Sequence, residues 1–130
     1  MPTALELTPD ERQSYIAALR RRRTLLDKPL SAEEKQAREQ LLERVRLAAS
    51  EIKMRLGARR VILFGSLAHQ AWFWPGSDVD LAVEGLRSEA YWEAWRIAEQ
   101  VIPDKSVDLV DVDVASPSLK SAIERYGIEL

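Results

Sequence analysis

The sequence predicts an α/β protein of the α+β kind: a small mixed sheet of about three to four strands flanked by helices, with an N-terminal helical hairpin. Two patterns predict it. Up to residue 57, apolar residues recur at helical spacing, whereas short apolar runs of strand length alternate with helical stretches after Arg60. The 130 residues, 46% hydrophobic and 31% charged, suit one core. We expect residues 1–57 to be a helical extension packed on the domain formed by residues 58–130.

Two helices are expected in the extension. A capping box at residues 8–11 opens the first, which ends at residues 28–29. A second capping box at residues 31–34 opens a longer helix, and Gly57 stands at its C-cap position. The apolar stripe of this longer helix has spacings of four, three, four and four residues: Leu41, Val45, Ala48, Ile52 and Leu56.

Three strands are expected after the extension. Residues 61–64 form a continuous apolar run that suits a buried strand, and residues 80–83 form a second one. Residues 106–112 alternate apolar and acidic side chains, which is typical of a strand with two different faces. These strands supply the sheet of the predicted domain.

Three helices are expected around the strands. A short one is capped by Ser66 and runs through Ala71, before a loop that holds Trp72, Phe73 and Trp74. Ser88 caps a second helix, which residue 103, a proline, stops. Residues 116–117 open the last helix, and Gly127 closes it.

The bulk composition limits the chemistry. The chain has no cysteine and one histidine, so any metal is held mainly by oxygen ligands. No apolar run approaches the roughly 18 residues of a membrane span, and the first residues do not read as a signal peptide, so we expect a cytoplasmic protein without a membrane partner. Residues 1–60 carry a net charge of +5 and residues 61–130 a net charge of −7. The acidic half suits cations.

Asp78 and Asp80 are the first candidates for chemistry. Residues two apart in a strand face the same way, about 7 Å apart, so the two carboxylates repel each other unless a cation lies between them. Mg²⁺ suits such oxygen ligands. A third carboxylate would complete a two-metal site for phosphoryl or nucleotidyl transfer, and Asp108, between apolar neighbours at the start of the third strand, is the best placed. Asp111 and Asp113 are assigned to the strand end.

The D-x-D spacing alone leaves alternatives open. Aspartate also begins turns, and glycosyltransferases use metal-binding D-x-D motifs. An EF-hand is excluded because residues 81–83 are apolar where ligands should continue. A phosphatase of the haloacid dehalogenase type is excluded because its D-x-D follows a strand, whereas here the strand follows the motif.

Gly65 and Ser66 make the pattern more specific. They follow a strand and open a short helix, where glycine permits close approach of the backbone and the serine hydroxyl and free N–H groups can bind phosphate oxygens. Phosphate-binding groups on one element and metal-binding carboxylates on the next point to one ligand, a nucleoside triphosphate.

The chain resembles the DNA polymerase β-like nucleotidyltransferase superfamily. The resemblance rests on LFGSLAHQAWFWPGSDVDLAV, VDLVDVD and LKSAIERYGIEL, covers roughly residues 51–130, and is nearest to the minimal nucleotidyltransferases (MNT domains) of bacteria and archaea. It implies a palm-like fold and a magnesium-dependent enzyme, with Mn²⁺ as the alternative metal. Its catalytic, metal-binding carboxylates would be Asp78, Asp80 and Asp108, the last on the metal that activates the attacking hydroxyl.

The same resemblance implies the nucleotide contacts and the partners. Gly65 and Ser66 would bind the triphosphate, with Ser77 also among the nucleotide-binding residues. The implied reaction transfers a nucleoside monophosphate, AMP from ATP, to a hydroxyl acceptor. Minimal members often pair with HEPN-domain toxins in toxin–antitoxin modules, so the expected partners are a nucleoside triphosphate and a helical HEPN-type protein, and an oligomer stays open.

Leu67 departs from the family pattern, which usually has a basic or polar residue directly after Gly-Ser. This departure motivates the alternative function, a non-catalytic antitoxin or interaction subunit that keeps the fold. His69 is either a nucleotide contact, a base, or a surface or capping residue. The aromatic residues 72–74 either stack an adenine, bind a partner or fold back on the core. The arginines at 20–23 lie all round a helix, so a nucleic-acid partner is not favoured.

Overall fold

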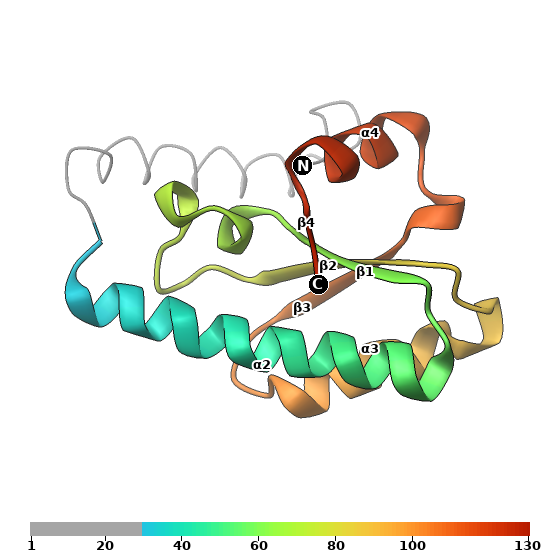
Figure 1. The fold of residues 1–130 in the computed structure, drawn as a ribbon, viewed down its shortest axis with the longest axis horizontal. Coiled ribbons are helices and arrows are strands. Elements are labelled where there is room, and N and C mark those ends of the chain that lie inside the picture. The colour runs from blue at the N-terminus through green and yellow to red at the C-terminus, as the bar shows by residue number, and fades with distance from the viewer. Residues whose placement is uncertain (1–29) are drawn as a thin grey trace.

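The computed structural model describes residues 30–130, which form a four-stranded sheet between two layers of helices (Figure 1). The elements in chain order are α2 (Ala32–Leu56), β1 (Arg60–Phe64), β2 (Val79–Glu84), α3 (Tyr91–Val101), β3 (Val107–Asp111), α4 (Pro117–Tyr126) and β4 (Ile128–Glu129). The helix expected before residue 29 and the arginines at 20–23 lie outside the described residues. The expected mixed α/β fold is confirmed.

The sheet is mixed, with strand order β3-β2-β1-β4. Strand β1 pairs antiparallel with β2 and with β4, whereas β2 and β3 run parallel, joined by α3 as the crossover. Strand β4 was not predicted from the sequence because its two residues are exposed and carry no apolar run. Backbone hydrogen bonding holds the end of the chain in place: the amide of Leu130 donates to the carbonyl of Val61 at 2.8 Å.

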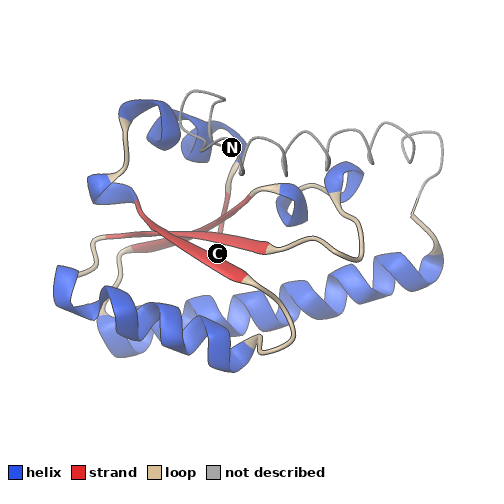
Figure 2. Ribbon diagram, turned by 180° about the vertical axis from the view of Figure 1, so that it is seen from behind, coloured by secondary structure: helices blue, strands red, loops and turns tan. Residues whose placement is uncertain are grey.

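Helix α2 begins and ends where the sequence predicts. The side chain of Ser31 accepts from the backbone amide of Glu34, the side chain of Glu34 accepts from the backbone amide of Ser31, and Gly57 adopts a left-handed φ of 73° at the C-cap. The apolar stripe of α2 packs with α3 against one face of the sheet, in a core that includes Val45, Ile52 and Leu63. Seen from behind, the same two helices lie on one side of the strands (Figure 2).

Helix α4 covers the opposite face of the sheet (Figure 1). A smaller buried cluster holds it there, made of Ile62, Phe64, Ala82, Val112 and Ile123. The Oγ of Ser116 accepts from the backbone amide of Leu119 and caps the helix, as the sequence predicts. Ion pairs of Arg60 with Glu84 and Glu124 join the helix to the sheet at this side.

Two predicted helix starts are wrong in detail. The helix expected from Ser66 through Ala71 is two separate 3₁₀ turns, Ser66–Ala68 and Gln70–Trp72, because His69 between them has an extended backbone and binds a distant carbonyl. Ser66 caps neither of them with its side chain. Ser88 opens a 3₁₀ turn rather than α3, since its Oγ pairs with the neighbouring Glu89.

The third strand is shorter than predicted. It ends at Asp111, and residues 112–114 form a 3₁₀ turn. The Oδ2 of Asp113 accepts from the amide of Gly85 at 2.9 Å, and the Oδ1 of Asp111 accepts from the amide of Asp113. Both carboxylates therefore fasten loops at the strand end, where the sequence assigned them. None of the helices within residues 30–130 is long and apolar enough to cross a membrane.

Candidate functional site

Asp80 and Asp108 lie side by side in the centre of the candidate site. They are register partners across the parallel pair β2 and β3. Val79 and Leu81, their neighbours in the chain, belong to the core under α2 and α3, so strand alternation turns Asp80 to the other face of the sheet, the side of α4. The parallel register thus brings together two of the three predicted catalytic carboxylates from residues 28 positions apart.

Gly65 lies directly against Asp80. Phe64, at the end of β1, is the register partner of Asp80, and the chain then turns at Gly65 with a φ of 75° and a ψ of −160°. A Cβ atom at position 65 would lie 2.2 Å from the Oδ2 of Asp80, so only glycine fits there. The predicted phosphate-binding turn and the predicted metal-binding strand are therefore in contact.

Like charges surround Asp80. Burial raises the pKa of its carboxyl most, and the carboxylates of Asp108 and Asp78 raise it further, to about 7. Within residues 30–130 no lysine or arginine forms an ion pair with Asp80. A half-buried carboxylate beside two others is costly unless a cation is bound, and a pKa raised in this way is typical of functional sites.

The two other predicted residues before β2 differ in exposure. Asp78 is exposed at the entry to the strand and interacts with Asp80 through its charge. Ser77 is buried, 1% exposed, and closes the preceding loop: its Oγ accepts from the amide of Trp74 at 3.1 Å, and its own amide donates to the carbonyl of Trp74. The observed partners of Ser77 are thus loop backbone groups.

The donor set of the site fits a hard divalent cation. Three carboxylates, Asp78, Asp80 and Asp108, interact, and carboxylate oxygens are the ligands that Mg²⁺ and Mn²⁺ take. In the part of the chain that the structure describes, no three acidic or histidine side chains are gathered closely enough to hold an ion. Asp78 and Asp108 are both exposed, so the two carboxylates beside Asp80 are open to solvent.

The turn after Gly65 is fastened from two sides. The side chain of Leu67 is fully buried in the core under α2, and the guanidinium of Arg38 on α2 donates from Nη2 to the carbonyl of Leu67 at 3.0 Å. On the other side, a ring nitrogen of His69 lies 2.9 Å from the carbonyl of Tyr126 at the end of α4. His69 therefore connects the turn to the last residue of α4, whose backbone carbonyl it contacts as a capping residue would.

The aromatic loop folds back on the protein. Phe73 is 5% exposed and belongs to the core under α2. The ring of Trp72 is half-buried and packs edge-on against His69, at 4.6 Å between centroids. The half-buried ring of Trp74 covers Gly76, where a Cβ would lie 1.9 Å from it. Of the interpretations left open by the sequence, packing on the core is confirmed for Phe73.

Arg38 is the residue of this region that the sequence reasoning missed. It lies three residues before Leu41, so it continues the apolar stripe of α2 at helical spacing. A charged residue on an otherwise apolar stripe is the signal that would have identified it.

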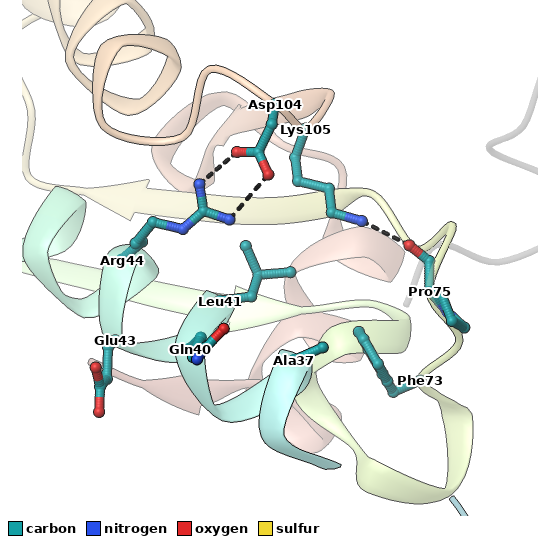
Figure 3. Close-up of a pocket in the computed structure, with 9 residues that line it drawn as sticks. All are labelled: Ala37, Gln40, Leu41, Glu43, Arg44, Phe73, Pro75, Asp104 and Lys105. Atoms are coloured by element: carbon teal, nitrogen blue, oxygen red, sulfur yellow. Dashed lines mark hydrogen bonds and ion pairs between the residues drawn. The ribbon is translucent and has the colours of Figure 1, made fainter. Parts of the chain in front are cut away.

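Cavities lie on either side of the region that the structure describes, and two of them are compared with the site. One of about 550 Å³ lies between α2, the loop at residues 73–75 and the loop before β3 (Figure 3). Its rim is tied by a two-pronged ion pair between Arg44 and Asp104 and by the Nζ of Lys105, which donates to the carbonyl of Pro75 at 2.6 Å. None of the predicted site residues lines this cavity.

The other cavity, of about 510 Å³, borders the candidate site. It lies between α3 and the start of β3, at the edge of the sheet, and Asp108 is one of its lining residues. Trp92 and Trp95 line the opposite side with parallel rings 5.6 Å apart. Trp92 is 70% exposed, which is unusual for a tryptophan, and large exposed aromatic surfaces next to a cavity are typical of binding sites.

Comparison with known proteins gives a family and a fold. The family model described as Polymerase beta, Nucleotidyltransferase matches residues 48–130. No curated protein matches the chain. A crystal structure from Shewanella oneidensis is 26% identical, with a TM-score of 0.50, over 65% of this chain and 66% of that chain. A toxin–antitoxin structure with AMP-PNP is also 26% identical, with a TM-score of 0.48, over 71% of this chain and 70% of that chain.

Proposed function

The chain belongs to the polymerase β-type nucleotidyltransferases, whose family model matches 83 of its 130 residues, and on that premise we propose that it transfers a nucleoside monophosphate, AMP from ATP, to a hydroxyl acceptor. The observation that carries the proposal is the contact of Gly65 with Asp80, which is itself in register with Asp108. It joins an anion-binding turn to a cluster of carboxylates, and a metal-bound triphosphate needs both.

Each residue of the site has a chemical task in this proposal. The backbone at Gly65 and Ser66 binds the phosphates that leave as pyrophosphate. Asp78, Asp80 and Asp108 would hold Mg²⁺, or Mn²⁺ in its place, and the metal would supply charge neutralisation of the phosphates and a lowered pKa of the acceptor hydroxyl. Asp108 orients the acceptor hydroxyl for in-line attack on the α-phosphorus and takes its proton as the new oxygen–phosphorus bond forms. The bond from the α-phosphorus to the bridging oxygen of pyrophosphate then breaks.

The order of the strands supports a direction of approach for the acceptor. In an in-line displacement the attacking and leaving oxygens lie on opposite sides of the phosphorus. Gly65 follows β1 and Asp108 lies on β3, on opposite sides of Asp80 on β2. Pyrophosphate therefore leaves on the β1 side, and the acceptor enters from the β3 edge, where the cavity beside Trp92 opens.

Replacement of Asp80 by asparagine tests the function. Asp80→Asn keeps the shape of the side chain but removes a proposed metal-binding charge from the half-buried centre of the site. We expect transfer of labelled AMP from ATP to fall by a factor of about 100–1,000 and Mg²⁺ binding to weaken, as for loss of a central electrostatic group. Glu43→Gln, at an exposed carboxylate of α2 away from the site, is the matched control and should retain transfer. Unchanged turnover in Asp80→Asn would refute the assignment.

A second function, that of a non-catalytic antitoxin or interaction subunit, is favoured by the exposure of Trp92, which suits a protein contact. The partner we propose is a helical HEPN-type toxin, from the resemblance of the sequence. An Asp78→Ala/Asp80→Ala double variant separates the two functions. If it is stably folded and neutralises the co-expressed toxin normally, the protein acts by binding, whereas loss of neutralisation supports an enzyme.

A further inference from the structure

Arg38 occupies a position that stability alone would give to an apolar residue. It stands on the buried stripe of α2, one turn before Leu41 and Leu42, and its side chain is only 12% exposed. Most arginines of globular proteins lie at the surface, and buried ones usually meet a carboxylate. The position of Arg38 therefore needs a reason.

The contacts of Arg38 do not balance its burial. Among residues 30–130 its ion-pair partner is Glu39, which lies 3.8 Å away and is 64% exposed, so that ion pair is weak. Among residues 30–130 the buried Nε of Arg38 has no hydrogen-bond partner, and burial lowers the pKa of the guanidinium. An unpaired buried donor costs about 1–3 kcal/mol. The strong contact that remains is the one from Nη2 to the carbonyl of Leu67.

That carbonyl belongs to the turn that carries the site. Leu67 directly follows Gly65 and Ser66, and the turn closes through the amide of Ala68, which donates to the carbonyl of Gly65 at 3.2 Å. Arg38 contacts this turn from the α2 side, whereas Asp80 contacts it at Gly65. A hydrogen bond to the Leu67 carbonyl fixes the orientation of the peptide groups that follow Ser66.

We propose that Arg38 is a positioning residue, which holds the Ser66–Ala68 turn in the conformation that binds the triphosphate by donating to the carbonyl of Leu67. The inference rests on the proposed function of that turn. It assigns a task in the site to α2 at a position before residue 48, where the family match begins. This role explains why an arginine stands on the apolar stripe of α2: its guanidinium is long enough to reach the Leu67 carbonyl and carries an N–H that donates to it.

The test compares Arg38→Met and Arg38→Lys with the full-length protein. Methionine keeps the length and packing of the side chain without a donor, and replacing a poorly paired buried charge by an apolar residue is often neutral or stabilising. We expect the melting temperature of Arg38→Met to stay or rise, while the dissociation constant for Mg·ATP, from titration calorimetry, rises about tenfold, the typical worth of a charged hydrogen bond. Arg38→Lys should recover part of the affinity.

Arg46→Met is the matched control, since Arg46 is an exposed arginine of the same helix. A second readout needs no nucleotide: the NMR shift of the Ala68 amide, which shares a peptide group with the Leu67 carbonyl. It should move in Arg38→Met and stay in Arg46→Met.

Two outcomes overturn the positioning role. One is a Mg·ATP dissociation constant of Arg38→Met within twofold of wild type, and the other is an Ala68 shift no larger than that of the control. If the wild-type protein itself fails to bind Mg·ATP, the proposed function fails, and the Ala68 shift still decides whether Arg38 holds the turn.

Discussion

On the face of the sheet that α2 and α3 cover, the inward side chains of β2 are Val79, Leu81 and Val83, all fully buried. On the face that α4 covers, the row across β1, β2 and β3 at the same level is Phe64, Asp80 and Asp108. One face is closed by a continuous apolar core, and the other keeps carboxylates where apolar residues would be more stable. This division fits the proposed function, with one side of the sheet for folding and part of the other for chemistry, and the pairs of variants below test it.

The largest loss of stability is expected on the α2 and α3 face. Leu63 is fully buried in the larger core, so Leu63→Ala should lower the free energy of unfolding by about 3–5 kcal/mol through lost burial and a cavity. Ile62, the next residue of β1, faces the smaller cluster under α4, which collapses more easily around a cavity. Ile62→Ala should cost less, about 2 kcal/mol. Urea denaturation of both variants checks this, and equal losses would show that the two faces are equally well packed.

Gly65 tests the close contact on the α4 face. Gly65→Ala forces a Cβ into the Oδ2 of Asp80 and strains a φ of 75°, so we expect a loss of about 1–3 kcal/mol in stability and at least a hundredfold loss of AMP transfer. Gly57→Ala is the matched control: its φ is 73°, but nothing lies within 4 Å of the added Cβ. It should share the backbone strain and retain transfer. Transfer lost equally in both variants would mean that destabilisation, not the site, is responsible.

Asp80 gives the α4 face a pH dependence of its own. Burial and the neighbouring carboxylates raise its pKa from 3.8 to about 7, so between these values the folded protein keeps a proton that the unfolded chain releases. Raising the pH from 4 to 7 therefore removes stability, on the order of 2 kcal/mol after the neighbouring side chains relax.

Thermal melts of EDTA-treated protein check this. Asp80→Asn should remove this fall in stability and be more stable than wild type at pH 8, and Mg²⁺ should stabilise the wild type alone. If the melting temperatures of the wild type and of Asp80→Asn change by the same amount between pH 4 and pH 7, the raised pKa of Asp80 is wrong.

The sequence predicts the two faces unequally. The apolar stripe of α2, the capping box at Ser31 and the three main strands follow from local patterns, because burial and capping leave a period or a motif in the sequence. The neighbours Asp80 and Asp108 were expected to share a site, and the parallel register brings them together. That Gly65 is required by contact with Asp80, and that Arg38 reaches Leu67, depend on tertiary packing between distant segments, which no local pattern encodes.

The short elements around the site were predicted least well. Residues 66–71 were expected as one helix, but the structure has two 3₁₀ turns, Ser66–Ala68 and Gln70–Trp72. The long-range contact of His69 with Tyr126 separates them. Strand β4 depends on pairing with β1 alone. Where a segment is held by a partner far away in the chain, propensity within the segment decides little.

The smallest effect on stability is expected at the cavity beside Asp108, where a substitution should change AMP transfer with little change in the free energy of unfolding. Trp92 is 70% exposed, so Trp92→Ala should change the free energy of unfolding by less than about 0.5 kcal/mol. Trp95, which packs partly against the core, is the contrasting position, and Trp95→Ala should cost more stability.

If the acceptor enters from the β3 edge, Trp92→Ala weakens transfer to the acceptor while Mg·ATP binding stays unchanged. Binding by calorimetry and transfer by labelled AMP measure the two separately. A Trp92→Ala protein with normal transfer would leave that edge of the sheet without a part in the reaction, and the acceptor would then have to reach Asp108 over the α4 face.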